Sequence, residues 1–331
     1  MSDAPATTLE LVSNLSRAKK SGTVSLHSEK SVAEIRLAHG NIEDALHGRA
    51  NGEKALYRAL AIPVAQATFA EGSPGGPARI STPTSALLEG APAILAALAR
   101  LRASFPESAT RPIVAADAGS AHGEISEHAR ALLHHLRTPQ LIDDLLDAVP
   151  SADAHILRAV AELEGAGRIR HLASTLSRTP LASHEQHERV RTMATLGLRR
   201  GFGTRVRLVF AGTPSRLAIL SHAMQCLVGA ESCGGAPVVP MPHPVVRIDL
   251  GSELELELVC LPLVPAYAPL WQMALTGSAV VVRLEEAAGS LLEEACEAAS
   301  AKIVDAHMLV GPYDEGNVAE VAVLIRAALE A

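Results

Sequence analysis

Two stretches without a periodic hydrophobic pattern divide the chain into three blocks. The first stretch, 106–123, is rich in proline, glycine and small residues, and the second, 174–203, is polar and then basic. Both compositions are typical of linkers. Since 331 residues exceed one ordinary hydrophobic core, we predict a multidomain protein with domains at 5–105, 124–173 and 204–331.

Composition narrows the class of protein. Hydrophobic residues make up 48% of the chain and charged residues 20%, which are globular values, but aromatic residues make up only 2%, so the cores must be aliphatic. The net charge of −7 does not indicate nucleic acid or an anionic membrane as the main partner. The four cysteines show no Cys-x-x-Cys spacing, which argues against a disulfide framework and a zinc site.

Two features of the sequence bear on localisation. The first residues lack the basic and apolar regions of a signal peptide. The most apolar stretch, around 91–102, contains Arg100 and Arg102 and is amphipathic rather than membrane-spanning. We therefore expect a cytoplasmic protein with no membrane association, no metal and no cofactor.

The first block mixes helical and strand-like periodicity. Apolar residues at helical spacing alternate with short β-branched runs, and Pro63 ends the second helix. A long final helix is expected to begin at a cap formed by Thr82 or Thr84, with one apolar stripe from Leu87 to Leu101. The expected elements are helices at about 9–20, 51–63 and 84–101, and strands at 23–27, 32–38, 42–46 and 64–69.

Three segments of this block, Gly22–Leu26, Ala33–Ile42 and Gly52–Leu60, carry a family pattern. They resemble the bacterial PATAN domain, a domain of unknown function named for the N-terminal domain of pattern-formation response regulators. Its helix, Gly-x-Ile hairpin, Gly-Glu-x-Ala helix, Phe-ending strand and Leu-rich helix match residues 5–105 in order. The resemblance implies an α+β module for regulatory protein–protein interaction, with no known catalysis.

The second block predicts three helices, at 124–136, 138–148 and 151–164, followed by a strand at 168–172. This outline resembles a winged helix-turn-helix, a module that commonly follows a PATAN domain. However, the third helix contains Asp153, Glu162 and Glu164 against a single Arg158. Because phosphate neutralisation supplies most of the affinity for DNA, we expect no nucleic-acid partner.

The third block is acidic, with 15 acidic against 7 basic residues from 204 to 331. It predicts strands at 206–210, 245–250, 253–259, 279–284 and 302–310, and helices at 215–228, 269–275, 286–300 and 314–330. At 253–259 leucine alternates with glutamate, so we expect Glu255 and Glu257 to face water. The order of elements resembles a Ras-like small GTPase, and Leu275–Val282 is similar to the segment leading into that family's fourth strand. The resemblance implies an α/β sheet domain of the P-loop type.

The nucleotide-binding motifs of that family are degenerate here. In the first loop only Gly212 matches, while residues 217–219 (Leu-Ala-Ile) stand where the glycine, lysine and serine or threonine are required. Pro214 removes a backbone donor from the turn, and Arg216 could replace the lysine only in a shifted register. The degenerate loop comprises Gly212, Thr213, Ser215 and Arg216.

The other two motifs of the family are also missing. The metal-binding Asp-x-x-Gly is replaced by Val259–Leu263, and the guanine-reading Asn-Lys-x-Asp has no counterpart in Ala306–Gly311. We therefore expect a pseudo-GTPase that binds no nucleotide.

The loop Leu261–Trp271 stands where the resemblance would place a switch segment that contacts effectors. It is uncharged and contains three prolines, and tyrosine and tryptophan are frequent interface anchors. The candidate partner-binding residues are Leu263, Tyr267, Leu270 and Trp271. The alternative is that Leu263, Leu270 and Trp271 pack on the core of their own domain.

These observations predict a multidomain α+β then α/β protein that is not an enzyme. Its expected role is that of a bacterial signalling adaptor or scaffold whose partner is a protein, a GTPase or another signalling protein. Two alternatives stay open. One is an unorthodox GTP-binding regulatory switch, and the other is a winged-helix transcription regulator.

Overall fold

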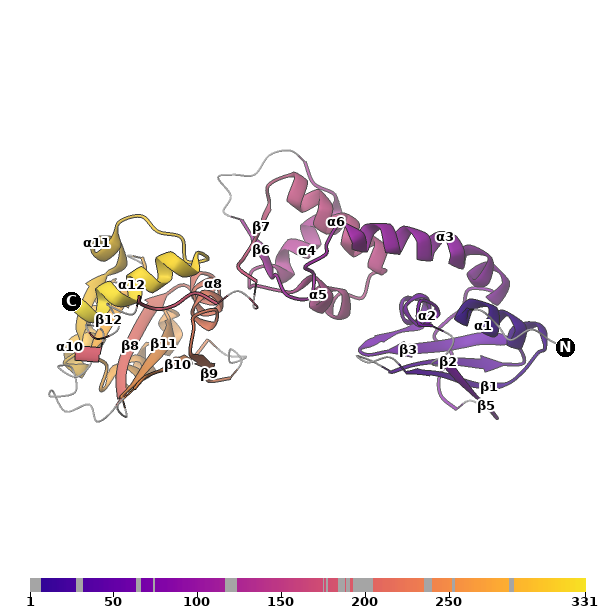
Figure 1. Cartoon of the computed structure of the whole chain (residues 1–331), viewed down its shortest axis with the longest axis horizontal. Helices are drawn as coiled ribbons and strands as arrows, with labels where there is room; N and C mark the ends of the chain where they lie inside the picture. Colours follow the sequence, from indigo (N-terminus) through magenta and orange to yellow (C-terminus); the bar gives the residue numbers. More distant parts are fainter. Residues whose placement is uncertain are drawn as a thin grey trace. The chain divides into compact units, whose positions relative to one another are not determined.

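The protein is a mixed α+β multidomain chain (Figure 1). The computed structural model describes residues 7–27, 32–63, 67–73, 75–116, 124–174, 176, 178–183, 188, 191–192, 205–234, 240–251, 254–285 and 289–331. The chain forms two compact units. Unit 1 comprises Met1–Ser108, Asp117–His135 and Ile142–Arg168, and unit 2 comprises Ala109–Ala116, Leu136–Leu141 and Ile169–Ala331.

Unit 1 contains a five-stranded antiparallel sheet with the strand order β4-β3-β2-β1-β5. Its strands are β1 (Gly22–His27), β2 (Val32–Ala38), β3 (Asn41–His47), β4 (Ala50–Asn51) and β5 (Ala67–Glu71). Its helices are α1 (Thr8–Arg17), α2 (Gly52–Leu60) and α3 (Thr84–Ala103). Alternate residues of β1 and β2 are buried against α1, α2 and the first turns of α3, so one face of the sheet forms an aliphatic core.

Most elements expected in this block are present within the described residues. The strand expected at 64–69 is β5 at 67–71, while 64–66 and the hairpin turn at 28–31 lie outside the described residues. Gly40 adopts a φ of 82°, and a Cβ there would lie 2.4 Å from the carbonyl oxygen of Ser16. This turn therefore requires glycine.

The expected threonine cap of α3 is wrong. Pro83 occupies the N-cap position, and no side chain caps the helix. Thr84 instead accepts a hydrogen bond from the backbone N–H of Ile42 at 2.8 Å, and Thr82 donates to Glu53. Tertiary contacts with β3 and α2 thus use both hydroxyls.

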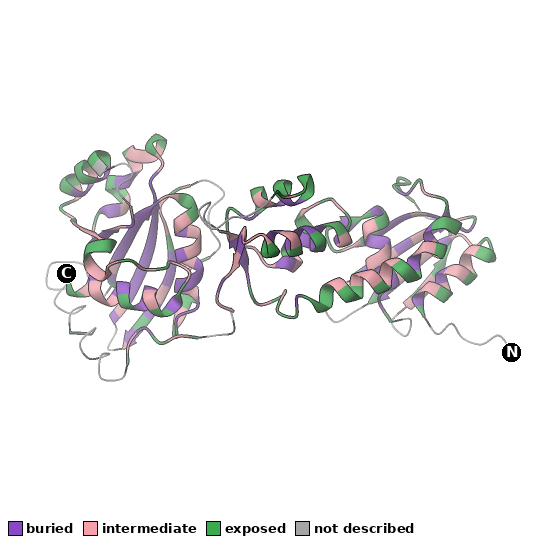
Figure 2. Cartoon of the chain, turned by 90° about the horizontal axis from the view of Figure 1, so that it is seen from above, coloured by how far each residue is buried: buried purple, intermediate pink, exposed green. Residues whose placement is uncertain are grey.

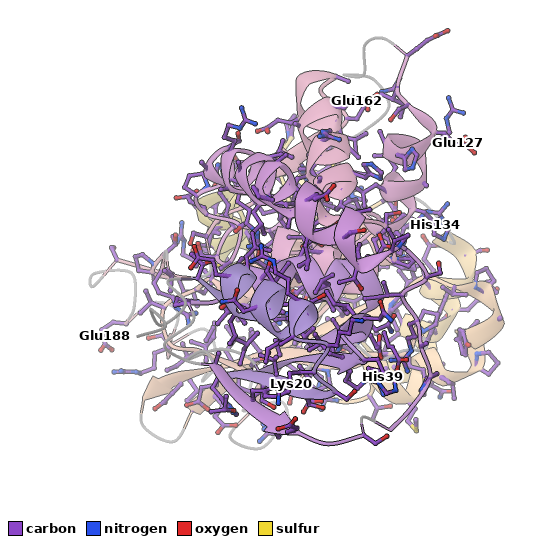
Figure 3. All side chains as sticks on the ribbon, turned by 90° about the vertical axis from the view of Figure 1, so that its right-hand side faces the viewer. Lys20, His39, Glu127, His134, Glu162 and Glu188 are labelled. Carbon is purple, nitrogen blue, oxygen red and sulfur yellow. The ribbon has the colours of Figure 1, made fainter. Side chains whose placement is uncertain are left out.

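Three further helices belong to unit 1, namely α4 (Glu127–His135), α5 (Ile142–Ala148) and α6 (Asp153–Gly165). Glu162 of α6, labelled in Figure 3, accepts hydrogen bonds from the backbone N–H and the hydroxyl of Ser126, the latter at 2.6 Å. These hydrogen bonds lower the pKa of Glu162. Ser126 also caps α4 by accepting from the N–H of Ala129, so one serine joins the start of α4 to α6.

Unit 2 contains a two-stranded antiparallel sheet of β6 (Ile113–Ala115) and β7 (Ile169–His171). Strand β6 falls within 106–123, which is predicted to be a linker from its composition. Ile113 also exchanges two backbone hydrogen bonds with Gln140. A three-residue strand carries too little periodicity to be recognised from sequence.

The main body of unit 2 is a six-stranded sheet with the order β13-β12-β8-β11-β10-β9. Its strands are β8 (Arg205–Gly212), β9 (Ala230–Ser232), β10 (His243–Gly251), β11 (Leu254–Pro262), β12 (Val280–Arg283) and β13 (Lys302–Asp305). Its helices are α8 (Pro214–Gln225), α9 (Ala268–Leu275), α10 (Gly289–Ala299), α11 (Ala306–Val310) and α12 (Val318–Glu330). Strands β11, β8, β12 and β13 run parallel, whereas β10 pairs antiparallel with both of its neighbours, β11 and β9.

Both faces of this sheet are covered, as the buried central strands in Figure 2 show. Leu208 and Phe210 of β8 belong to a core that includes α8 and α12, while Val209 and Ala211 belong to a second core that includes α9 and α10. A central parallel strand is therefore apolar on both sides, as the unbroken hydrophobic runs indicate.

Two sequence expectations for this sheet are wrong. The strand expected at 302–310 ends at Asp305, and α11 follows, since periodicity does not separate short apolar runs of helix from strand. Glu257 does not face water, because β11 lies between β8 and β10. Its carboxylate is buried and paired with Arg207 at 2.8 Å, Arg247 at 3.2 Å and Arg205 at 3.6 Å.

Within the part of the chain that the structure describes, one helix, α3, is long and apolar enough to cross a membrane by length and composition. Its 18-residue window has a mean hydropathy of 1.3 and is 17% buried. A single such helix is weak evidence for a membrane span, and α3 carries Pro92, Arg100 and Arg102.

Candidate functional site

The carboxyl-terminal edge of the six-stranded sheet is the candidate site. Because β8, β11, β12 and β13 are parallel, the segments that follow them meet at one edge, which is where α/β sheets bind ligands. The structure brings the degenerate loop to this edge as the turn between β8 and α8, with Thr213 at the N-cap position and Pro214 in the first turn.

Gly212 is enclosed by the chain's own neighbouring strands. Its carbonyl oxygen accepts a hydrogen bond from the N–H of Leu263 at 2.8 Å, and the N–H of Leu284 donates to Ala211 at 2.9 Å. A Cβ on Gly212 would lie 3.0 Å from Leu284 Cδ1. This glycine therefore allows close packing of the Leu284 side chain, a role that involves no phosphate.

The donors that a phosphate would use at this edge are bonded to carboxylates of the same chain. The backbone N–H of Thr213 donates to Glu285 Oε1. Arg216 donates from Nε to Glu315 Oε1 at 2.7 Å and from Nη1 to the carbonyl oxygen of Leu284 at 2.9 Å. Arg216 Nη1 also lies 3.9 Å from Glu285 Oε2. Two acidic side chains thus stand where an anion would bind.

Arg283, Asp305 and Glu293 at this edge are similarly engaged, whereas the buried hydroxyl of Tyr313 has no hydrogen-bond partner among the described residues. Arg283 binds both carboxylate oxygens of Asp305, at 2.5 and 3.1 Å, and Glu293 at 3.0 Å. These hydrogen bonds lower the pKa of Asp305 and raise that of Arg283. Burial raises the pKa of the Tyr313 phenol, which Arg216 opposes and Glu285 reinforces. A neutral phenol, two paired arginines and their carboxylates provide no activated nucleophile.

The partner-binding candidates divide into buried and half-buried residues. Trp271 is 0% exposed and Leu263 is 7% exposed, and both belong to the core beneath α9 and α10. For these two the structure shows the alternative, which is packing on the core of their own domain. Tyr267, in the 3₁₀ turn Pro265–Tyr267, and Leu270 are half-buried.

One exposed apolar side chain of α9, Met273 at 71% exposure, is not among the residues predicted from the sequence. Trp271 and Leu275 are one helical turn apart and face the core, so Met273 between them faces outward. This spacing in the sequence indicates that Met273 lies on the outer face of α9.

A second group of charges lies in unit 1, between α2 and the segment joining α5 to α6. Arg58 binds Asp153 through two hydrogen bonds of 2.7 and 2.8 Å, and it also donates to Asp147 and to the carbonyl oxygen of Leu146. Lys54 donates to the carbonyl oxygen of Val149 and lies 3.5 Å from Asp153. We call Lys54, Arg58 and Asp153 the α2–α6 charge cluster. Through Asp153, its first residue, α6 is joined to α2.

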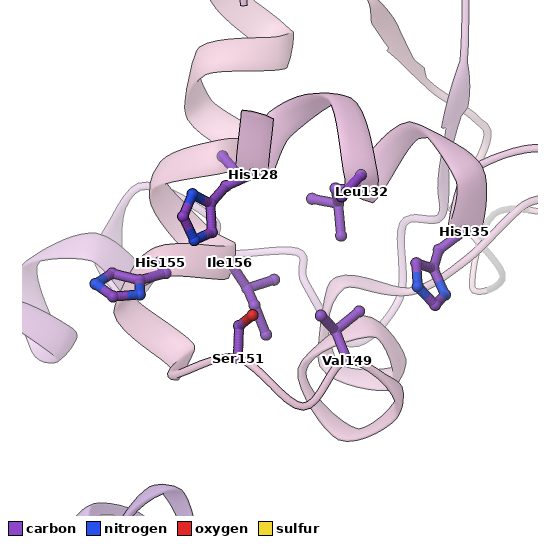
Figure 4. Close-up of a pocket in the computed structure, with 9 residues that line it drawn as sticks. His128, Leu132, His135, Val149, Ser151, His155 and Ile156 are labelled. Carbon is purple, nitrogen blue, oxygen red and sulfur yellow. The ribbon is translucent and has the colours of Figure 1, made fainter. Parts of the chain in front are cut away.

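A small pocket of about 70 Å³ in unit 1 is lined by three histidines, with Leu132 and Ile156 beside them (Figure 4). His128 and His155 contact edge to face, with ring centroids 5.6 Å apart, while His135 lies on the other side of the pocket. Over the described residues, no group of three or more His, Cys, Asp or Glu side chains is arranged to hold a metal ion.

The basic residues of the second block are also placed by the structure. Arg170 of β7 pairs with Asp314 at 2.6 Å within unit 2, and Arg168 and His171 have contacts of their own. Arg158 of α6 is exposed.

No family model, curated protein or solved structure matches this chain.

Proposed function

We propose that the chain is a non-enzymatic, cytoplasmic bacterial signalling adaptor in which unit 2 carries a GTPase-like domain without nucleotide binding. One observation carries the proposal. The Thr213 amide and the Arg216 guanidinium are bonded to Glu285 and Glu315, so a nucleotide phosphate would have to displace two carboxylates of like charge.

The assignments of the three blocks rest on separate supports. The parallel strands β11, β8, β12 and β13, with β10 antiparallel beside them, favour a GTPase-like sheet. The order of helices and strands in residues 5–105 favours a PATAN-like interaction module. The use of Asp153 and Glu162 of α6 in contacts within unit 1 favours a structural role for the winged-helix segment over DNA reading.

Nucleotide addition tests the central claim. GTP or ATP with Mg²⁺ should leave the melting temperature of the full chain unchanged, whereas a ligand at about 100 times its Kd would add about 2.7 kcal/mol of stability. The variant Glu285→Gln, Glu315→Gln, which removes both negative charges, serves as a comparison. A shift of several degrees in the wild-type chain with GTP, absent with buffer, would overturn the proposal and favour a GTP-binding switch.

Duplex DNA tests the transcription-regulator alternative. At low salt we expect affinity no tighter than the non-specific range of about 10⁻⁴–10⁻⁶ M. Sub-micromolar binding with a steep salt dependence would favour the regulator instead.

We place the partner surface on Tyr267, Leu270 and Met273, at and after the loop that follows β11. Partners are identified by co-purification from the native host with mass spectrometry. Tyr267→Ala combined with Met273→Ser should weaken capture by about 2 kcal/mol, the scale of an interface hot spot. Met308→Ser is the matched control, because Met308 is 81% exposed on α11. Equal loss in both variants, or no loss in either, would refute this placement.

A further inference from the structure

A pocket of about 470 Å³ lies in unit 1 between α2, α3 and α6. Its volume falls in the range of small-molecule sites, which are typically apolar with a few polar groups that fix orientation. The pocket is separate from the edge of the six-stranded sheet, so its role is independent of the function proposed for that edge.

One wall of the pocket is apolar and comes from α3. Ala93 and Ala97 are one helical turn apart, and Ile94 and Leu98 stand beside them. Ile94, Ala97 and Leu98 are only half-buried and Ala93 is exposed, so this face of α3 is incompletely covered by the chain. The two alanines leave the space that larger side chains would fill.

The opposite wall is polar and comes from α2 and α6. Its acidic groups are already held, since Asp153 is bonded to Arg58 and approached by Lys54, and Glu53 accepts a hydrogen bond from Thr82. In contrast, Arg158 is exposed and makes no ion pair with any described residue.

Two further donors line the same wall. Burial and the nearby Glu53 raise the pKa of Tyr57, so its phenol keeps its proton and can donate a hydrogen bond. His155 extends from the first turn of α6. Arg158 and Tyr57 are therefore donors that remain open to a ligand, and Arg158 carries a full positive charge.

We propose that this pocket binds a small amphipathic anion, with its apolar body against α3 and its anionic group at Arg158 and Tyr57. Such a ligand would contact α2, α3 and α6 together and would stabilise their packing.

The test uses the full chain and the fluorescent sulfonate 8-anilinonaphthalene-1-sulfonate as the probe. The dye should bind with one saturable site, and decanoate should displace it far better than decyltrimethylammonium, which has the same alkyl chain and the opposite charge. Arg158→Gln should weaken dye binding about tenfold, as expected for loss of a hydrogen bond between charged groups. Arg130→Gln, an exposed arginine of α4 that does not line the pocket, should leave it unchanged.

A second set of variants tests the proposal by placing larger side chains in the pocket. Ala97→Phe should abolish saturable binding while the circular dichroism spectrum and melting temperature match those of the wild type. Ala93→Leu, at an exposed position, gives the same information if Ala97→Phe does not fold. Wild-type dye affinity in a folded filled variant, equal displacement by the cationic and anionic competitors, or no saturable binding would each overturn the proposal.

Discussion

Replacing Arg58 by alanine should destabilise unit 1 strongly. The Arg58 side chain is 9% exposed and Asp153 is 4% exposed, and two hydrogen bonds of 2.7 and 2.8 Å join them. The alanine variant leaves a buried carboxylate with only Lys54 at 3.5 Å, and the Leu146 carbonyl oxygen loses its donor. Removal of one partner from a buried ion pair costs about 3–5 kcal/mol. We expect the lower part of that range because Lys54 remains.

Urea unfolding followed by far-ultraviolet circular dichroism measures this loss. The fluorescence of Trp271, the one tryptophan of the chain, reports on unit 2 in the same samples. Arg58→Lys retains the charge without the two-pronged hydrogen bonding and should lose less than Arg58→Ala. A double-mutant cycle with Asp153→Asn isolates the coupling energy of the pair.

Arg17→Ala is the matched control, since Arg17 is exposed in the last turn of α1 and should change stability by less than about 0.5 kcal/mol. If Arg58→Ala loses no more than this control, the α2–α6 charge cluster does not hold the two helices together and the reasoning is refuted.

Three further predictions concern unit 2. Trp271→Ala should cost about 3–5 kcal/mol. Trp271→Phe should cost less, because phenylalanine refills most of the space and the buried Nε1 has no hydrogen-bond partner among the described residues; similar urea midpoints for the two variants would contradict this. Burial raises the pKa of Cys260 to about 12 and of Cys296 to about 11, so a thiol reagent should label the half-buried Cys233 first and these two only on unfolding, as peptide mass spectrometry would reveal. Burial raises the pKa of Glu257, but hydrogen bonds from arginines outweigh this effect and the net shift of the pKa is downward. The contribution of Glu257 to folding stability is therefore complete above its ordinary pKa near 4.5 and is lost as pH falls through the folded pKa. Glu257→Gln should therefore make the free energy of unfolding less dependent on pH in this acidic range.

The local pattern was sufficient for most of the secondary structure. Alternating burial in β1 and β2, and the unbroken apolar runs of β8 and β12, follow from residue spacing alone. The resemblance of the loop at Gly212 to a degenerate phosphate-binding loop rests on consecutive residues, so the sequence alone can suggest it, and it stays a prediction.

The carboxylates that bind the polar groups of that loop could be identified only from the tertiary structure. Glu285 lies 72 residues from Thr213 and Glu315 lies 99 residues from Arg216, so no local pattern relates them. Only the parallel strand order brings the ends of β8 and β12 to one edge.

Burial of polar groups was likewise decided by neighbours. Glu257 alternates with leucine as an exposed residue would, yet β11 is central and arginines from β8 and β10 pair with it. Trp271 is of a residue type that is frequent at interfaces, yet its position on α9 makes it face the core of its own domain. Sequence spacing determines which residues share a face of a helix or strand, whereas the packing of other elements decides whether that face meets water, because burial and pairing are made by residues distant in the chain.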